Sequence, residues 1–161
     1  MHPPGGKAAK RPDRAVSVYC RRIREAYGDI PVAIGGVEAS LRRFAHYDYW
    51  DDKVMPSILV DSGADLLMFG MGERSILVTA DWMSRGAQAW ECAKMRGVCY
   101  MAPGPMRGSI EIPSFEECVS SKRKYAEAFL VQYNEQEPKH PRVCAMENCT
   151  SSMAGTPPSA S

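Results

Sequence analysis

The sequence lacks the features of an exported or membrane-embedded protein. No apolar run approaches the roughly eighteen residues that a membrane span requires. The amino terminus is rich in Pro, Gly and Lys, where a secretory signal would need an apolar segment. The net charge is only +1 over 161 residues, so no strong field is present to hold nucleic acid or an anionic membrane. We therefore expect a cytoplasmic protein that binds neither nucleic acid nor membrane.

The cysteines lack the spacing of a disulfide framework or a metal site. They are scattered along the chain, at Cys20, Cys92, Cys99, Cys118, Cys144 and Cys149. Because nothing marks the chain for export, reduced thiols are the favoured interpretation. Cys144 and Cys149 are separated by four residues and have only His140 as a further soft ligand nearby, so no metal site is predicted.

The motifs of nucleophilic catalysis are also missing. Neither Ser40 nor Ser57 lies in a G-x-S-x-G turn, and His46 is the only well-placed imidazole. Asp48, Asp51 and Asp52 form an acidic group beside Lys53 and Arg43, which indicates ion pairs rather than a catalytic cluster. The neighbouring aromatics Tyr47, Tyr49 and Trp50 are interpreted as core or interface anchors rather than a stacking site for a base. No catalytic residue is predicted.

What the chain does contain is an alternation of short apolar runs and helical patterns. Residues 31–34, 64–69 and 98–101 read as buried strands, and helices are predicted for residues 12–27, 73–85 and 114–136. This alternation favours βαβ units with right-handed crossovers. The expected fold class is α/β, with a partial open parallel sheet of the Rossmann-like type, a long C-terminal helix and a disordered tail.

The helical spacing also predicts which side chains are buried. In the first helix these are Val16, Tyr19, Ile23, Ala26 and Tyr27, with Arg21, Arg22, Arg24 and Glu25 solvated; in the second they are Ile76, Leu77, Ala80 and Met83. A capping box at Ser114 and Glu117 begins the last helix, whose apolar side carries Phe115, Cys118, Val119, Tyr125, Ala126, Phe129 and Tyr133.

Composition divides the chain into four segments. Residues 1–11 read as a loop, 12–112 as a partial α/β domain, 113–138 as a helix leading toward a further domain, and 139–161 as a disordered or aberrant tail. Residues 151–161 contain almost only Ser, Pro, Ala, Gly and Thr, apart from Met153, so little is available to bury.

The densest group of polar side chains follows the first predicted strand. It reads GGVEASLRRFAHYDYWDDK from Gly35, and DSGADLLMFGMGER follows from Asp61. These two stretches resemble the YgiQ-type family of radical S-adenosylmethionine proteins, and the resemblance covers roughly residues 4–138. It concerns the amino-terminal region of that family, not its catalytic barrel.

The resemblance implies a parent enzyme that binds a 4Fe-4S cluster and cleaves S-adenosylmethionine to a 5′-deoxyadenosyl radical. Such enzymes hold the cluster through three thiolates, usually in C-x3-C-x2-C, and this sequence has no such triplet. The family's amino-terminal domain is similar in plan to cobalamin-binding domains, but the D-x-H-x-x-G string is absent too. No cofactor is expected in this chain, and no activity when it is alone.

The candidate site is the edge where the first two strands end. In an open parallel sheet, ligands bind outside the carboxyl ends of the strands. The residues predicted to converge there are Gly35, Gly36, Glu38, Arg42, Arg43, His46, Asp48, Gly70, Gly72 and Glu73. The resemblance implies that this edge faces the missing barrel domain in cis; a small-ligand pocket and plain surface loops are the alternatives.

Three functions follow as hypotheses. The first is an accessory amino-terminal domain of a radical S-adenosylmethionine enzyme whose barrel is missing, as in a truncated reading frame. The second is a stand-alone α/β module that binds a small ligand at the glycine-rich edge. The third is a truncated product without function, because missing early strands would leave a sheet edge open.

Overall fold

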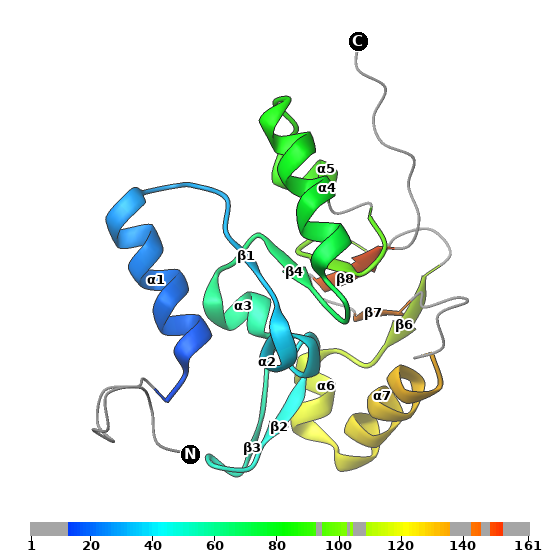
Figure 1. Ribbon diagram of the computed structural model, residues 1–161. Helices are drawn as coiled ribbons and strands as arrows, with labels where there is room; N and C mark the ends of the chain where they lie inside the picture. The colour runs from blue at the N-terminus through cyan, green and yellow to red at the C-terminus, as the bar shows by residue number, and fades with distance from the viewer. Residues whose placement is uncertain are drawn as a thin grey trace.

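A computed structural model describes residues 13–92, 95–102, 104, 109–135, 143–145 and 149–152 (Figure 1). The helices are α1 Ala15–Tyr27, α2 Gly36–Leu41, α3 Ile58–Ser62, α4 Glu73–Ser84, α5 Ala89–Cys92, α6 Phe115–Ser120 and α7 Lys122–Asn134. The strands are β1 Ala33–Ile34, β2 His46–Asp48, β3 Lys53–Met55, β4 Leu66–Met68, β5 Val98–Tyr100, β6 Ile110–Ile112, β7 Val143–Ala145 and β8 Cys149–Ser152. No helix in these ranges is long and apolar enough to cross a membrane.

The α/β class with an open sheet is confirmed, but the sheet is mixed rather than parallel. The strand order is β1-β4-β5-β8-β7-β6. β1 and β4 pair in parallel, with Ala33 opposite Leu66, whereas β5 runs antiparallel to β4, with Cys99 opposite Leu67. The predicted crossover therefore holds between the first two strands and fails for the third.

The reason is a second helix that the sequence patterns did not predict. α5 folds back against α4, and the two share an apolar cluster with β4 and β5 that includes Trp82, Met83 and Cys92. The chain thus returns to the end of the sheet at which β4 finished, where the Phe69 N–H donates to the Gly97 carbonyl at 2.9 Å. A strand that starts at that end must run antiparallel to its neighbour.

α1 ends where predicted but begins at Ala15, later than predicted, and it buries a different face. It ends at Gly28, which has a φ of +74°. Cys20 is its buried residue and Val16 packs beside it, whereas Tyr19 and Tyr27 are more than half exposed. In α4, similarly, Thr79 is buried and Val78 packs inward, while Leu77 is exposed. Burial in both helices is set by the elements they pack against, chiefly α3 for α1 and α5 for α4, rather than by the strongest apolar stripe.

The predicted long C-terminal helix is two helices, separated at Ser121. This residue is extended, with a φ of −145° and a ψ of 116°, and its Oγ accepts from the Lys124 N–H, which starts α7. The break changes the helical phase, so that Tyr125, Ala128 and Val131 face the core together with Cys118. The capping box of Ser114 and Glu117 is present as predicted.

The structure also contains a β-hairpin and two C-terminal strands that the sequence patterns did not predict. β2 and β3 pair antiparallel with Tyr47 opposite Val54, within a stretch for which only polar density was noted. Within residues 139–161, the segment predicted to be a disordered or aberrant tail, the structure places β7 and β8, which extend the sheet; the bounds of that tail stay a prediction. The remaining residues of that segment lie outside the described part, as does the predicted loop 1–11.

Candidate functional site

The glycines of the predicted site come together at one edge of the sheet. Because β1 and β4 are parallel neighbours, the turns that follow them are adjacent. They enclose a hollow of about 260 Å³, lined by Ala33, Ile34, Gly35, Gly36, Met68, Gly70, Gly72 and Ile76. All four predicted glycines line this hollow, and none of the six predicted charged residues does.

Two of these positions need glycine for a physical reason. A Cβ on Gly35 would lie 3.3 Å from the Met68 carbonyl oxygen, so the neighbouring strand would have to shift. Gly36 has a φ of +85°, a conformation that costs an L-residue about 1 kcal/mol or more. The hollow is therefore shaped by a close approach of two backbones.

Ser40 joins the two turns, a role that the sequence did not reveal. Its Oγ donates to the Gly36 carbonyl at 2.8 Å and accepts from the Gly70 N–H at 3.2 Å. A single hydroxyl thus connects the loop after β1 to the loop after β4. A serine one helical turn after a glycine pair was the available signal, but it predicts this bond only if the two strands are known to be neighbours.

The predicted charged residues on and after α2 lie beside the hollow. Glu38 and Arg42 form an ion pair of 3.1 Å along α2. The Arg43 guanidinium donates to the Ser40 carbonyl at 2.5 Å and lies over the rings of Phe44 and Phe69. Its charge is thus placed against aromatic faces rather than toward the hollow.

Glu73 is separate from this group. It is exposed in the first turn of α4, where a carboxylate complements the helix dipole. The structure therefore provides a structural reason for this residue that needs no ligand. Its predicted role at the edge stays a prediction.

His46 and Asp48 belong to the hairpin rather than to the hollow. Burial lowers the pKa of His46, whose Nδ1 is 3.2 Å from the Phe44 carbonyl. The Trp50 N–H, donating to Asp48 at 3.0 Å, lowers the pKa of that carboxyl. Asp48 is almost fully buried and pairs with Arg14 at 3.3 Å.

The ion-pair interpretation of the acidic group is confirmed for Asp48 and Asp51, although one of the cations is different, and Asp52 instead accepts from the Tyr47 hydroxyl. Arg14 reaches both Asp48 and Asp51, and Lys53 pairs with Asp51 at 3.2 Å. The pairing of Arg14 with the hairpin joins the start of α1 to a segment more than thirty positions away. Sequence proximity had indicated Arg43 instead.

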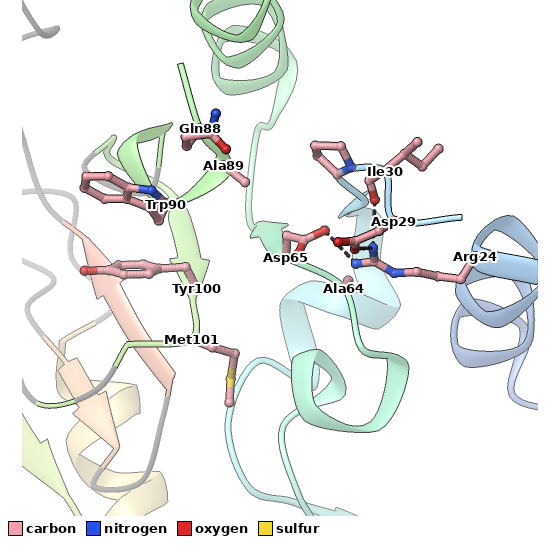
Figure 2. A pocket seen from close by; sticks show the side chains of 11 residues that line it. Arg24, Asp29, Ile30, Ala64, Asp65, Gln88, Ala89, Trp90, Tyr100 and Met101 are labelled. Carbon is pink, nitrogen blue, oxygen red and sulfur yellow. Dashed lines mark hydrogen bonds and ion pairs between the residues drawn. The ribbon is translucent and has the colours of Figure 1, made fainter. Parts of the chain in front are cut away.

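A larger hollow lies at the opposite end of β1 and β4, where these strands begin. It has a volume of about 380 Å³ and is lined by Arg24, Asp29, Ile30, Pro31, Ala64, Asp65, Gln88, Ala89, Trp90, Tyr100 and Met101 (Figure 2). The lining comes from α1, the segments that precede β1 and β4, the start of α5, and the end of β5. Because β5 is antiparallel to β4, its end lies beside the starts of β1 and β4.

The charged groups of this larger hollow bind one another. Arg24 donates to Asp29 and Asp65, both at 2.8 Å, and to the carbonyls of Ile30 and Gly63 (Figure 2). Asp65 also accepts from the Val32 N–H at 2.7 Å. We interpret the network as structural: it connects α1 to the segments that immediately precede β1 and β4. The prediction that Arg24 is solvated was wrong.

The described residues do not fit an iron–sulfur cluster. Among them, no group of three His, Cys, Asp or Glu side chains is placed to hold a metal. Cys20, Cys92, Cys99 and Cys118 are buried and form no disulfide, and burial raises the pKa of the thiols of Cys20, Cys92 and Cys118. Cluster ligands must be thiolates, so these last three thiols are unsuited to that role.

Comparison with known proteins identifies related sequences but no related structure. The family described as Radical SAM N-terminal matches residues 1–161. A UPF0313 protein of Clostridium perfringens is 51% identical over 151 residues, covering 92% of this chain and 23% of that protein. A UPF0313 protein of Clostridium botulinum strain 657 is 52% identical over 139 residues, covering 85% and 22% respectively. No solved structure matches. The chain thus spans about a quarter of the length of these relatives.

Proposed function

Because the chain belongs to the radical SAM N-terminal family, we propose that it is the accessory amino-terminal domain of a radical S-adenosylmethionine enzyme. The cluster and the S-adenosylmethionine are bound by a catalytic domain outside this chain. The observation that supports this most directly is coverage: the whole chain matches the family, yet it corresponds to about a quarter of the relatives. The donor set of the described residues agrees with such a division of labour.

Within that function, the glycine-rich edge faces the catalytic domain. Its shape supports this assignment, because Gly35 and Gly36 keep the surface free of side chains where another backbone or a substrate would approach. The ion pair of Glu38 and Arg42 provides polar groups beside it. We place the assembled enzyme in the cytoplasm, where an iron–sulfur cluster is protected from oxidation.

A chimera tests the proposal. This chain replaces the corresponding segment of the C. perfringens UPF0313 protein, and iron content and 5′-deoxyadenosine formation are measured after anaerobic reconstitution. We expect the chimera to hold a cluster and cleave S-adenosylmethionine, and the 161-residue chain to do neither. Arg42→Glu and Gly36→Val in the chimera should reduce turnover, whereas Arg85→Glu, on the far end of α4, should not. A chimera that folds but never cleaves S-adenosylmethionine would contradict the proposal.

A second candidate is a small-ligand module at the same edge, favoured by the hollow of about 260 Å³. A ligand that binds there should perturb the amide signals of Gly36 and Gly70 in the isolated chain. Ser40→Ala should weaken such binding by loosening both turns. The two candidates differ in whether any ligand binds without the catalytic domain.

A further inference from the structure

The outer face of α7 carries an apolar group that nothing described in this structure covers. Phe129, Leu130 and Tyr133 are 58%, 58% and 61% exposed. The opposite side of the same helix already packs inward, through Tyr125, Ala128 and Val131. A helix that needs one apolar face to fold therefore displays a second one. We call Phe129, Leu130 and Tyr133 the outer face of α7.

This face is a preformed ridge rather than three unrelated side chains. The rings of Phe129 and Tyr133 stack with their centroids 6.3 Å apart, one helical turn from each other. Lys124 and Glu127, an ion pair of 3.2 Å, lie on another side of the helix. Aromatic residues with charges excluded to the periphery are the composition of interface centres.

The helix beneath the ridge is held firmly. α7 contacts α6 and β6, and the Tyr125 hydroxyl accepts from the Tyr47 N–H of the hairpin at 3.0 Å. A partner would meet a rigid surface, so little conformational entropy would be lost on binding.

We propose that the outer face of α7 is the docking surface for the remainder of the longer protein, the catalytic portion that relatives carry in the same chain. The inference rests on the proposed function and gives the catalytic domain a second contact surface, in addition to the glycine-rich edge. About three quarters of each relative lies outside the segment that this chain matches. A domain carried in the same polypeptide as this segment meets its surface at high effective concentration, so the exposed apolar side chains of α7 suit a contact within one longer chain.

Hydrogen exchange of α7 tests the inference in the chimera with the C. perfringens UPF0313 protein. We expect the α7 amides to exchange at least about 10-fold more slowly in the chimera than in the isolated chain, because docking suppresses local opening of the helix. The triple variant F129Q/L130Q/Y133Q should remove that protection while leaving the far-ultraviolet spectrum of the isolated chain unchanged. Leu77→Gln, at an exposed position of α4, is the matched control and should leave α7 protection intact.

Three results would overturn the inference. The first is equal exchange of α7 in the chain and the chimera. The second is protection that survives the triple variant. The third is light scattering that shows the isolated chain to be a dimer which the triple variant dissociates, because the occupant would then be a second copy. Cleavage of S-adenosylmethionine by the chimera is read separately: an active chimera with unprotected α7 refutes this surface alone, and an inactive chimera with protected α7 refutes the proposed function alone.

Discussion

Single side chains in this protein serve two elements at once. The Ser40 hydroxyl connects the turn after β1 to the turn after β4 by hydrogen bonds. Arg24 connects α1 to the segments that precede both strands. Arg14 similarly connects α1 to Asp48 of the hairpin. Such bonds join positions that are distant in sequence. Replacing one of these side chains should therefore change the free energy of unfolding of the whole chain.

His46 should make the stability of the chain depend on pH near neutrality. Burial lowers its pKa in the folded state below the usual value of 6.5. The unfolded chain therefore takes up this proton first as the pH falls, so the stabilisation is fully present above about pH 6.5 and is lost as the pH falls toward the folded pKa. Urea unfolding at pH 7.5, 6.5 and 5.5 measures this loss. His46→Gln should show a smaller loss across the same range, and identical losses would contradict the expectation.

Thr79 should tolerate the loss of its hydroxyl. Its side chain is 3% exposed, and within the described residues its Oγ1 has no hydrogen-bond partner. Because Val keeps the shape and removes the unsatisfied oxygen, Thr79→Val should raise the free energy of unfolding by about 1 kcal/mol. Thr79→Ser is the control: it keeps the hydroxyl and removes the methyl group, and it should destabilise. Equal destabilisation by both variants would show that the oxygen is satisfied.

The elements are short, and their ends are defined by specific groups. α6 begins at Ser114, whose Oγ accepts from the Glu117 N–H at 3.3 Å while the Glu117 carboxylate accepts from the Ser114 N–H at 2.9 Å. Ser121 caps α7 with a single bond, its Oγ accepting from the Lys124 N–H at 3.4 Å. Because the two helices meet at one extended residue, the caps set the direction of α7 and thereby of its outer face.

Removal of the first cap should cost stability at the level of the helix. Ser114→Ala leaves the Glu117 N–H in the first turn of α6 without its side-chain acceptor, so we expect a loss of about 1 kcal/mol in the free energy of unfolding. Ser120→Ala is the matched control, since the Ser120 hydroxyl bonds the Glu117 carbonyl within the same helix and caps nothing. Thermal unfolding followed by circular dichroism compares the two variants. A smaller loss for Ser114→Ala than for Ser120→Ala would argue against the cap.

At the scale of the whole molecule, the four cysteines whose burial the structure describes are distributed over three separate apolar clusters. Cys20 and Cys99 belong to one apolar cluster, Cys92 to a second and Cys118 to a third. The fold uses these four thiols as small buried apolar groups.

The isolated chain should consequently bind no stoichiometric iron–sulfur cluster. Buried thiols with a raised pKa remain protonated and are poor ligands for iron. Iron and sulfide analysis with the visible spectrum after anaerobic reconstitution measures this, with the full-length C. perfringens relative treated in parallel. A stable cluster that cleaves S-adenosylmethionine would refute the expectation, and Cys118→Ala, Cys144→Ala and Cys149→Ala would then identify its ligands.

Local sequence determined where this chain bends and where several helices begin and end. Gly28 ends α1 and the capping box starts α6, because such signals depend on the backbone conformation of a few adjacent residues. The long motif from Gly35 likewise carries the family resemblance within one contiguous stretch, and the match to the family confirms it.

Only the tertiary structure decided how these pieces face one another. The return of α5 along α4 makes β5 antiparallel to β4. The end of β5 thereby helps to line the larger hollow, at the opposite end of the strands from the glycines. The bond of Ser40 to Gly70, the contact of Arg14 with Asp48 and the exposure of Phe129 and Tyr133 all depend on segments far apart in sequence. Burial and long-range bonds are properties of packing, which no periodicity within a single segment contains.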